Sequence, residues 1–205
     1  MENKRRVGIM GGTFDPIHNG HLVLAERAYE QFNLEHILFL PSGNPPHKRE
    51  RFGGASDADR LEMVRLAIGG NAHFVLDDEE MYRNGYSYTK DTLRILNEVH
   101  PDTEFYFIIG ADSLMAFDTW MNPECIAKLC VLVAAVRDGL DHTAMYETMA
   151  QLKERYGADV RLLETPELDI ASSRLRAWCR EGRSLRYYVP DSVYEYISAN
   201  HLYQE

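Results

Sequence analysis

Short apolar runs alternate along this chain with longer stretches in which apolar residues recur every three or four positions. Several runs are unbroken, which is typical of strands covered on both faces in a parallel sheet. Strands are expected at Val7–Met10, Ile37–Leu40, Phe74–Leu76, Phe105–Ile109, Val131–Val136 and Val160–Leu163. Helices are expected at His21–Phe32, Asp57–Ile68, Thr89–Val99, Thr143–Tyr156, Ser173–Arg180 and Asp191–Ala199. The alternation predicts an α/β fold, a doubly wound and mostly parallel sheet with helices on both faces.

Length and charge limit the organisation of the chain and its partners. With 205 residues and 45% hydrophobic content, residues 1–205 are expected to form a single domain, with a helical part at about 172–205 packed on it. The net charge of −10 disfavours nucleic acid, although the basic arm Lys4-Arg5-Arg6 leaves that alternative open. We expect no membrane partner and a cytoplasmic location, because no apolar run reaches the ~20 residues of a membrane span and no signal-peptide pattern is present.

The segment after the first expected strand has the features of a phosphate site. In doubly wound sheets, ligands bind where strands end, and here the chain reads Gly11–His21, GGTFDPIHNGH, before a helix expected to open at Leu22. Two glycines permit close backbone approach, and a helix N-terminus favours an anion. His18 and His21 can present both rings to phosphoryl oxygens. The alternatives are a surface pair and a metal site, but the latter lacks a third ligand at a recognised spacing.

This segment resembles the signature of the H-x-G-H nucleotidyltransferase superfamily, here His18-Asn19-Gly20-His21. The resemblance implies a Rossmann-like nucleotidyltransferase fold. It also implies that His18 and His21 contact the phosphates of ATP and stabilise the transition state of attack on the α-phosphorus. The further ATP-binding residues that it implies in this segment are Gly11, Gly12, Thr13 and Phe14.

A second candidate phosphate segment, Ile170–Arg176, opens a late helix. Its serines could cap that helix, and the guanidinium of Arg176, expected in the first turn, could reach phosphate oxygens. An ordinary surface helix with solvated arginines is the alternative. The segment is similar to the superfamily motif I-S-S-T-x-x-R, with Ala171 in place of the first serine and Ser173 in place of the threonine. The ATP-binding residues implied here are Ile170, Ser172, Ser173 and Arg176.

Two segments point to the second substrate. Asn44-Pro45-Pro46-His47-Lys48 follows the second strand, where two prolines stiffen the backbone before a His-Lys pair; a generic polar loop is the alternative. It resembles the P-P-H-K element of bacterial nicotinate mononucleotide adenylyltransferases, which faces the phosphates of both nucleotides. By that likeness, the residues expected at the pyridine nucleotide here are Asn44, His47 and Lys48.

The stretches Tyr86–Leu93 and Phe107–Leu114 are similar to the S-Y-T-x-D-T-L and F-I-I-G-A-D elements of the same family. Backbone N–H groups at the helix start near Thr89 could bind a carboxylate, and an aromatic ring could stack on a pyridine. Trp120 is the candidate ring, although a place in the core is its alternative. The likeness implies that Tyr88, Thr89 and Trp120 recognise the nicotinate, that Asp112 contacts both nucleotides, and that Gly110 lies at ATP.

After the fifth strand, Arg137-Asp138-Gly139 stands where this family has R-P-G, which implies that Arg137 lies near the adenosine. The likeness spans the chain, which is identified as a member of the bacterial nicotinate mononucleotide adenylyltransferases. The implied reaction joins the AMP moiety of ATP to nicotinate mononucleotide, giving deamido-NAD and pyrophosphate in NAD biosynthesis. Mg²⁺ would be held by phosphate oxygens and water rather than by protein side chains. The catalytic residues implied are His18, His21, Lys48 and Arg176.

Other functions remain open at this point. Phosphopantetheine adenylyltransferases and cytidylyltransferases share the H-x-G-H element, and only the second-substrate residues separate them from this family. A catalytically silent nucleotide-binding or sensor module is a further alternative. The sequence does not indicate the preference for nicotinate over nicotinamide, the oligomeric state (a homodimer is one candidate), loop motions or regulation.

Overall fold

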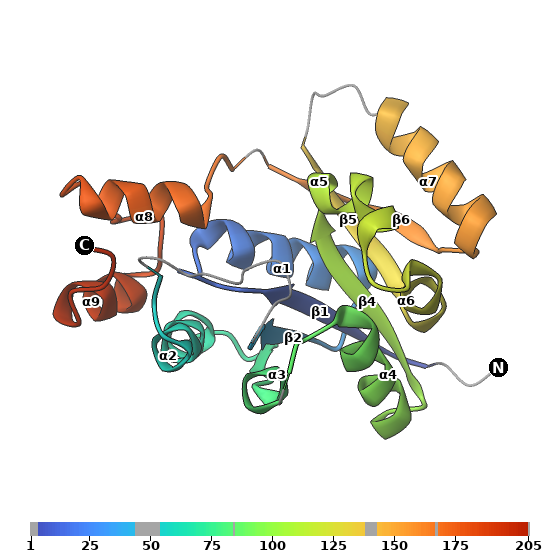
Figure 1. Cartoon of the computed structure of the whole chain (residues 1–205), viewed down its shortest axis with the longest axis horizontal. Coiled ribbons are helices and arrows are strands. Elements are labelled where there is room, and N and C mark those ends of the chain that lie inside the picture. The colour runs from blue at the N-terminus through green and yellow to red at the C-terminus, as the bar shows by residue number, and fades with distance from the viewer. Residues whose placement is uncertain (1–3, 44–53, 84, 138–142, 167, 205) are drawn as a thin grey trace. The chain divides into compact units, whose positions relative to one another are not determined.

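The computed structural model describes residues 4–43, 54–83, 85–137, 143–166 and 168–204 (Figure 1). Six strands form one sheet in the order β3-β2-β1-β4-β5-β6, with helices around it, as the sequence predicts. The strands are β1 (Arg5–Gly12), β2 (His36–Pro41), β3 (Phe74–Leu76), β4 (Thr103–Gly110), β5 (Val131–Arg137) and β6 (Val160–Thr165).

The strand order reverses between β1 and β4, which lie side by side as a parallel pair (Figure 1). Met10 is paired with Ile108, two residues before the end of each strand. The pairs β4–β5 and β5–β6 are also parallel. Ligands of doubly wound sheets bind at such a reversal, at the carboxyl ends of the strands, and here β1 ends at Gly12 and β4 at Gly110.

The sequence predicted most helices closely. The helices described are α1 (Asn19–Phe32), α2 (Asp57–Ile68), α3 (Glu79–Tyr82), α4 (Thr89–Val99), α5 (Ala111–Met115), the 3-10 turn η1 (Phe117–Thr119), α6 (Pro123–Leu129), α7 (Thr143–Tyr156), α8 (Ser172–Arg180) and α9 (Asp191–Ala199). Two starts were wrong: α1 begins at Asn19 rather than at His21 or Leu22, and α8 begins at Ser172 rather than Ser173.

The short elements α3, α5, η1 and α6 were missed because none is long enough to show a helical period. α6 nevertheless has a local signal. The side chain of Asn122, at φ 56°, accepts from the N–H of Cys125, and Pro123 occupies the first helical turn. The helix α2, whose bounds were predicted, has a complete capping box, in which Ser56 and Asp59 satisfy each other's backbone N–H groups.

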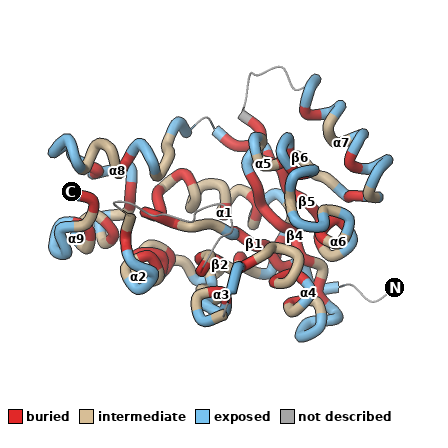
Figure 2. Tube along the Cα trace, in the orientation of Figure 1, coloured by how far each residue is buried: buried red, intermediate tan, exposed pale blue. Residues whose placement is uncertain are grey.

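The described chain groups into two compact units, and each is described by itself. The first comprises Met1–Gly11, Leu24–Leu38 and Tyr88–Glu167. In it α5 packs on β4, and α6 packs on both α4 and α7. Figure 2 shows burial concentrated along β4 and β5, where the unbroken apolar runs predicted it. The grouping leaves the expected single domain, with residues 172–205 packed on it, as a prediction.

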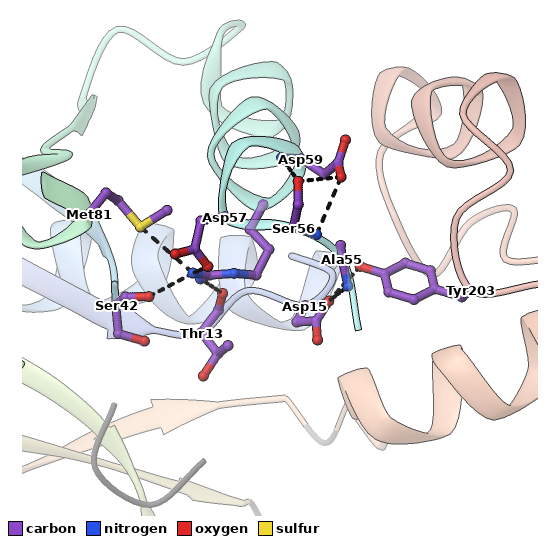
Figure 3. Close-up of polar contacts among 10 residues, drawn as sticks. Thr13, Asp15, Ser42, Ala55, Ser56, Asp57, Asp59, Met81 and Tyr203 are labelled. Atoms are coloured by element: carbon purple, nitrogen blue, oxygen red, sulfur yellow. Dashed lines mark hydrogen bonds and ion pairs between the residues drawn. The ribbon is translucent and has the colours of Figure 1, made fainter. Parts of the chain in front are cut away.

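The second unit comprises Gly12–Val23, Phe39–Ser87 and Leu168–Glu205, and in it α2 packs on α9. Among the described residues of this unit, the most buried polar side chain is that of Arg60 in α2, which is 0% exposed. The guanidinium donates to the carbonyl oxygens of Thr13 at 2.6 Å and Ser42 at 2.8 Å, and to Asp57 at 2.6 Å (Figure 3). Because Thr13 follows β1 and Ser42 follows β2, this arginine fixes the turns at two strand ends.

No helix in the described part of the chain combines the length and apolar character needed to cross a membrane.

Candidate active site

The two histidines of the first strand-to-helix turn lie against each other. The rings of His18 and His21 are stacked with centroids 3.7 Å apart and planes inclined by 21°, and Phe14 meets His21 edge-on at 5.1 Å. The backbone N–H of His18 donates to Nδ1 of His21 at 3.2 Å. Because that nitrogen accepts, the neutral His21 ring carries its proton on Nε2, which can donate to a ligand.

Burial keeps both rings neutral at physiological pH. His18 is 5% exposed, and the exclusion of water lowers its pKa from 6.5 to about 4. The pKa of His21 is lowered well below its usual value, first by desolvation and then by repulsion from His18. Among the described residues none offers Nδ1 of His18 a hydrogen bond, which is unusual for a buried nitrogen. The pair therefore presents neutral N–H donors rather than fixed positive charge.

Acid is expected to destabilise the fold through His18. Above pH 6.5 the ring is neutral in both folded and unfolded chains, so it contributes no pH dependence. As the pH falls from 6.5 to about 4, only the unfolded chain binds the proton, and the free energy of unfolding falls by about 3 kcal/mol from this group. The free energy of unfolding, measured with urea across this pH range, should fall less steeply for His18→Gln than for wild type.

The matched control for this measurement is His100→Gln, at an exposed position that ends α4. It should retain the wild-type dependence on pH. An undiminished acid-induced loss of stability in His18→Gln would show that the buried ring is not its source.

Gly20 makes room for the histidine stack. A Cβ at this position would lie 3.0 Å from Nδ1 of His18 and 3.7 Å from Cβ of Ile170. Since His18 is enclosed, its ring has little space to move aside. The glycine between the two histidines is therefore required for space.

We expect Gly20→Ala to displace the His18 ring and lower kcat by about 10- to 100-fold, because small errors in position cost that much at a reacting centre. Steady-state kinetics on a variant with an intact far-UV spectrum would measure this. Gly70→Ala is the control, since a Cβ there meets nothing within 4 Å. Equal kcat for the two variants would contradict the steric role of Gly20.

The late segment Ile170–Arg176 contacts the segment Thr13–His21 that follows β1, which we call the histidine turn. The hydroxyl of Ser172 donates to the carbonyl of Pro16 at 2.9 Å, and Nη1 of Arg176 donates to the carbonyl of Asp15 at 2.6 Å. Nη1 also lies 3.7 Å from Oδ2 of Asp15. The structure thus brings together the two segments that sequence assigned to ATP, although they are more than 150 residues apart.

Two details of this segment were predicted wrongly. Its serines do not cap α8: the N-cap is Ala171, with no side-chain cap bond, and the hydroxyl of Ser172 is used by Pro16 instead. Arg176 is the fifth residue of α8 and lies beyond its first turn. Among the described residues no partner pairs with Nε or Nη2 of Arg176, so these groups can donate to a ligand.

Sequence reasoning missed Asp15, Arg60 and Tyr203, which hold this turn in place. Oδ1 of Asp15 accepts from the N–H of Ala55 at 3.0 Å and from the hydroxyl of Tyr203 at 2.8 Å (Figure 3). A signal existed for Arg60, because it shares the buried stripe of α2 with Met63 at helical spacing. Local sequence gives no signal for the pairing of Asp15 with Tyr203.

Four of the candidate residues for the pyridine nucleotide, namely Tyr88, Thr89, Asp112 and Trp120, lie in the first unit. Tyr88 is the N-cap of α4 and makes no side-chain cap bond, and Thr89 is the first residue of that helix, so its N-terminus remains suited to a carboxylate. Asp112 is exposed and is the second residue of α5, the helix that begins directly after β4 ends at Gly110. Trp120 is half-buried, tilted on Phe117 at 5.5 Å. That packing supports the indole and leaves part of it accessible.

The structure describes the remaining candidate residues only in part. Asn44, His47 and Lys48 lie outside the described residues. Arg137 ends β5, and only its backbone is described. Gly11 is exposed where β1 ends, and a Cβ there would touch the ring of Phe107 at 3.4 Å. Within the described ranges no three His, Cys, Asp or Glu side chains gather as a metal site.

The doubly wound sheet and the paired histidines after β1 define a nucleotidyltransferase, and residues 9–178 match the cytidylyltransferase-like family. A relative from Lachnoclostridium phytofermentans, named "Probable nicotinate-nucleotide adenylyltransferase", is 46% identical over 97% of this chain and 99% of its own. One of the same name from Desulfitobacterium hafniense (strain Y51) is 42% identical over 98% of this chain and 96% of its own. The chain therefore belongs to the nicotinate-nucleotide adenylyltransferase family.

The fold has a matching solved structure. Nicotinic acid mononucleotide adenylyltransferase of Plasmodium falciparum, complexed with NaAD, superposes with a TM-score of 0.78 over 97% of both chains, at 20% identity. At that identity the likeness concerns the fold.

Proposed function

We propose that this enzyme transfers the AMP moiety of ATP to nicotinate mononucleotide, giving nicotinate adenine dinucleotide and pyrophosphate for NAD biosynthesis. The observation that carries the proposal is the contact of Arg176, from α8, with the turn that bears the His18–His21 stack, in a chain 46% identical to a relative of that name. The turn supplies N–H donors and α8 supplies one guanidinium, and these are groups that bind and stabilise phosphate oxygens.

The reaction needs no nucleophilic side chain. A phosphate oxygen of the mononucleotide is already an anion near neutral pH; it attacks the α-phosphorus of ATP and forms the new P–O bond. The bond from the α-phosphorus to the bridging oxygen breaks, and its electrons leave with pyrophosphate. The protein's part is therefore to position two anions in line and to stabilise the charge that passes to the leaving group.

We assign these tasks to groups on the histidine turn, to Arg176 of α8 and to Lys48. Nε2–H of His21 donates to an oxygen of the α-phosphoryl group, where a neutral donor offers a hydrogen bond without binding the ground-state anion as strongly as a cation would. His18 lies stacked beside it and supports the same group. Arg176 takes the β- and γ-phosphates through the donors that Asp15 does not use. We propose Lys48 as a fourth phosphate contact.

We propose Mg²⁺ as the cofactor, bound through phosphate oxygens and water, where it would neutralise triphosphate charge. Asp15 fits poorly as a ligand, because Ala55 and Tyr203 already donate to its Oδ1 and the guanidinium of Arg176 lies 3.7 Å from its Oδ2. We also propose a cytoplasmic location and small-molecule substrates, without nucleic acid or membrane. A homodimer is the assembly to test first, by light scattering.

Recognition of the pyridine nucleotide is assigned to the start of α4 and to Trp120. Backbone N–H groups beginning at Thr89 would bind the nicotinate carboxylate, and the indole would stack on the ring. A carboxylate gains from the helix dipole and a carboxamide does not, so nicotinate is the expected substrate.

Trp120→Ala is expected to raise the KM for nicotinate mononucleotide by about tenfold, the order of a lost aromatic stack, while changing the KM for ATP little. Initial rates at varied concentrations of each substrate would separate the two. An unchanged KM for the mononucleotide, with lowered thermal stability, would assign the indole to packing on Phe117 instead.

The direct test of the function is pyrophosphate release from ATP and Mg²⁺ with nicotinate mononucleotide, nicotinamide mononucleotide, or 4′-phosphopantetheine offered in turn, with CTP replacing ATP in a further arm. The proposal predicts the fastest release with ATP and nicotinate mononucleotide. Faster release with phosphopantetheine or with CTP would reassign the enzyme within the superfamily, and no release under any condition would indicate a binding module.

A further inference from the structure

A buried tyrosine is linked to the candidate phosphate arginine through one carboxylate. Tyr203 lies after α9 and is 6% exposed, and its hydroxyl donates to Oδ1 of Asp15 at 2.8 Å. Asp15 is also 6% exposed, and it contacts Arg176 through its carbonyl oxygen at 2.6 Å and through Oδ2 at 3.7 Å. Figure 3 shows the contact of Tyr203 with Asp15, and the contact of Asp15 with Arg176 extends this chain of contacts to α8.

Asp15 would compete with a bound phosphate for the guanidinium of Arg176. The Nη1 group of Arg176 points to the carbonyl of Asp15, while the carboxylate stays at 3.7 Å, longer than a hydrogen bond. A buried carboxylate without other donors would attract an arginine into a close bidentate pair. Such a pair would turn the guanidinium away from a ligand.

Two donors prevent that closure. The N–H of Ala55 and the hydroxyl of Tyr203 both bind Oδ1, so they stabilise the negative charge on the side away from Arg176. Burial and the neighbouring Asp15 raise the pKa of Tyr203, which keeps its hydroxyl protonated and able to donate. The backbone of Tyr203 adopts φ 63°, an unfavourable region for a non-glycine residue, so its placement depends on the contacts of its buried ring and hydroxyl.

We propose that Tyr203 is a positioning residue for ATP: by sharing the charge of Asp15, it keeps Arg176 free to bind the triphosphate. This inference rests on the proposed function, because it takes Arg176 as a ligand of ATP. It adds a residue from the segment after α9 to the machinery of the site, acting through Asp15 and without touching substrate.

The test is a double-mutant cycle read out as binding of α,β-methylene-ATP with Mg²⁺ by calorimetry. Tyr203→Phe removes one oxygen and is expected to raise the Kd by about tenfold, the order of a hydrogen bond to a charged group. In an Asp15→Asn background, where no carboxylate competes for Arg176, the same substitution should change the Kd by less than about twofold.

Tyr196→Phe is the matched control. Its hydroxyl donates to Asp59 at 2.9 Å in the same unit, and Asp59 does not pair with Arg176. This variant should lose thermal stability as Tyr203→Phe does, yet keep the wild-type Kd within about twofold. Equal Kd values for Tyr203→Phe and Tyr196→Phe would reduce Tyr203 to a packing residue and overturn the proposal.

An equal effect of Tyr203→Phe in both backgrounds would also overturn it, because the effect would then bypass Asp15. Should Tyr203→Phe fail to fold, Asp15→Asn alone tests the proposal. This variant keeps an acceptor for Tyr203 but removes the charge that competes for Arg176, so the analogue should bind more tightly than to wild type. Weaker binding would contradict the proposal. Wild-type protein that neither binds the analogue nor releases pyrophosphate would instead reject the proposed function.

Discussion

Replacing His21 with alanine is expected to lower kcat by more than tenfold, toward the ~10²–10³-fold typical of a lost transition-state donor, with the fold intact. Its Nδ1 is already bound by the backbone of His18, so Nε2 is its free donor, and the alanine variant removes that donor without removing a charge. Because the lost interaction is made mainly in the transition state, kcat should fall more than the KM for ATP rises.

The measurement is steady-state pyrophosphate release by purified variants whose circular dichroism and melting temperature match wild type. His100→Ala, at the exposed end of α4, is the control and should keep wild-type kinetics. A wild-type kcat for His21→Ala would show that His21 takes no part in the mechanism, and the stacked pair would then have no catalytic explanation.

Arg176→Met is expected to raise the KM for ATP and to lower kcat/KM by about 100-fold, the order of two hydrogen bonds to a charged group. The guanidinium is held near the turn by the carbonyl of Asp15 and has further donors for phosphate. Methionine keeps much of the packing volume and removes every donor. The KM for nicotinate mononucleotide should change less than the KM for ATP, because Arg176 is assigned to the triphosphate.

Arg174→Met provides the comparison within the same helix. Arg174 is paired with Asp169 at 2.6 Å and is 46% exposed, so its loss should affect neither KM. Initial-rate kinetics for both variants and for wild type would measure the difference. Similar kinetics for Arg174→Met and Arg176→Met would mean that neither arginine has a specific role at the phosphates.

The parts of the fold that were predictable are those with repeated local signals. The bounds of α2, α4, α7 and α9 match the prediction, and each spans at least two turns. The missed α6 has seven residues, too few for a period, and its start was readable only from the Asn122-Pro123 pair. Local propensity therefore suffices for long elements and fails for the short ones.

The candidate site, too, was predictable only where the sequence carries a local motif. The histidine turn and Arg176 were found by likeness to known motifs, and the structure joins them through Asp15 and Pro16. The serine hydroxyl of residue 172 was misassigned, because a capping serine and one that bonds a distant loop look identical in sequence. Tyr203 was missed because its partner Asp15 is 188 residues away, and only tertiary structure reveals such a pair.

We propose above all that the His18–His21 stack and Arg176 bind the triphosphate of ATP. The most direct test of this proposal is a crystal structure of the protein with α,β-methylene-ATP and Mg²⁺. The account predicts phosphate oxygens within hydrogen-bond distance of Nε2 of His21 and of the guanidinium of Arg176. A triphosphate bound away from both residues would contradict it.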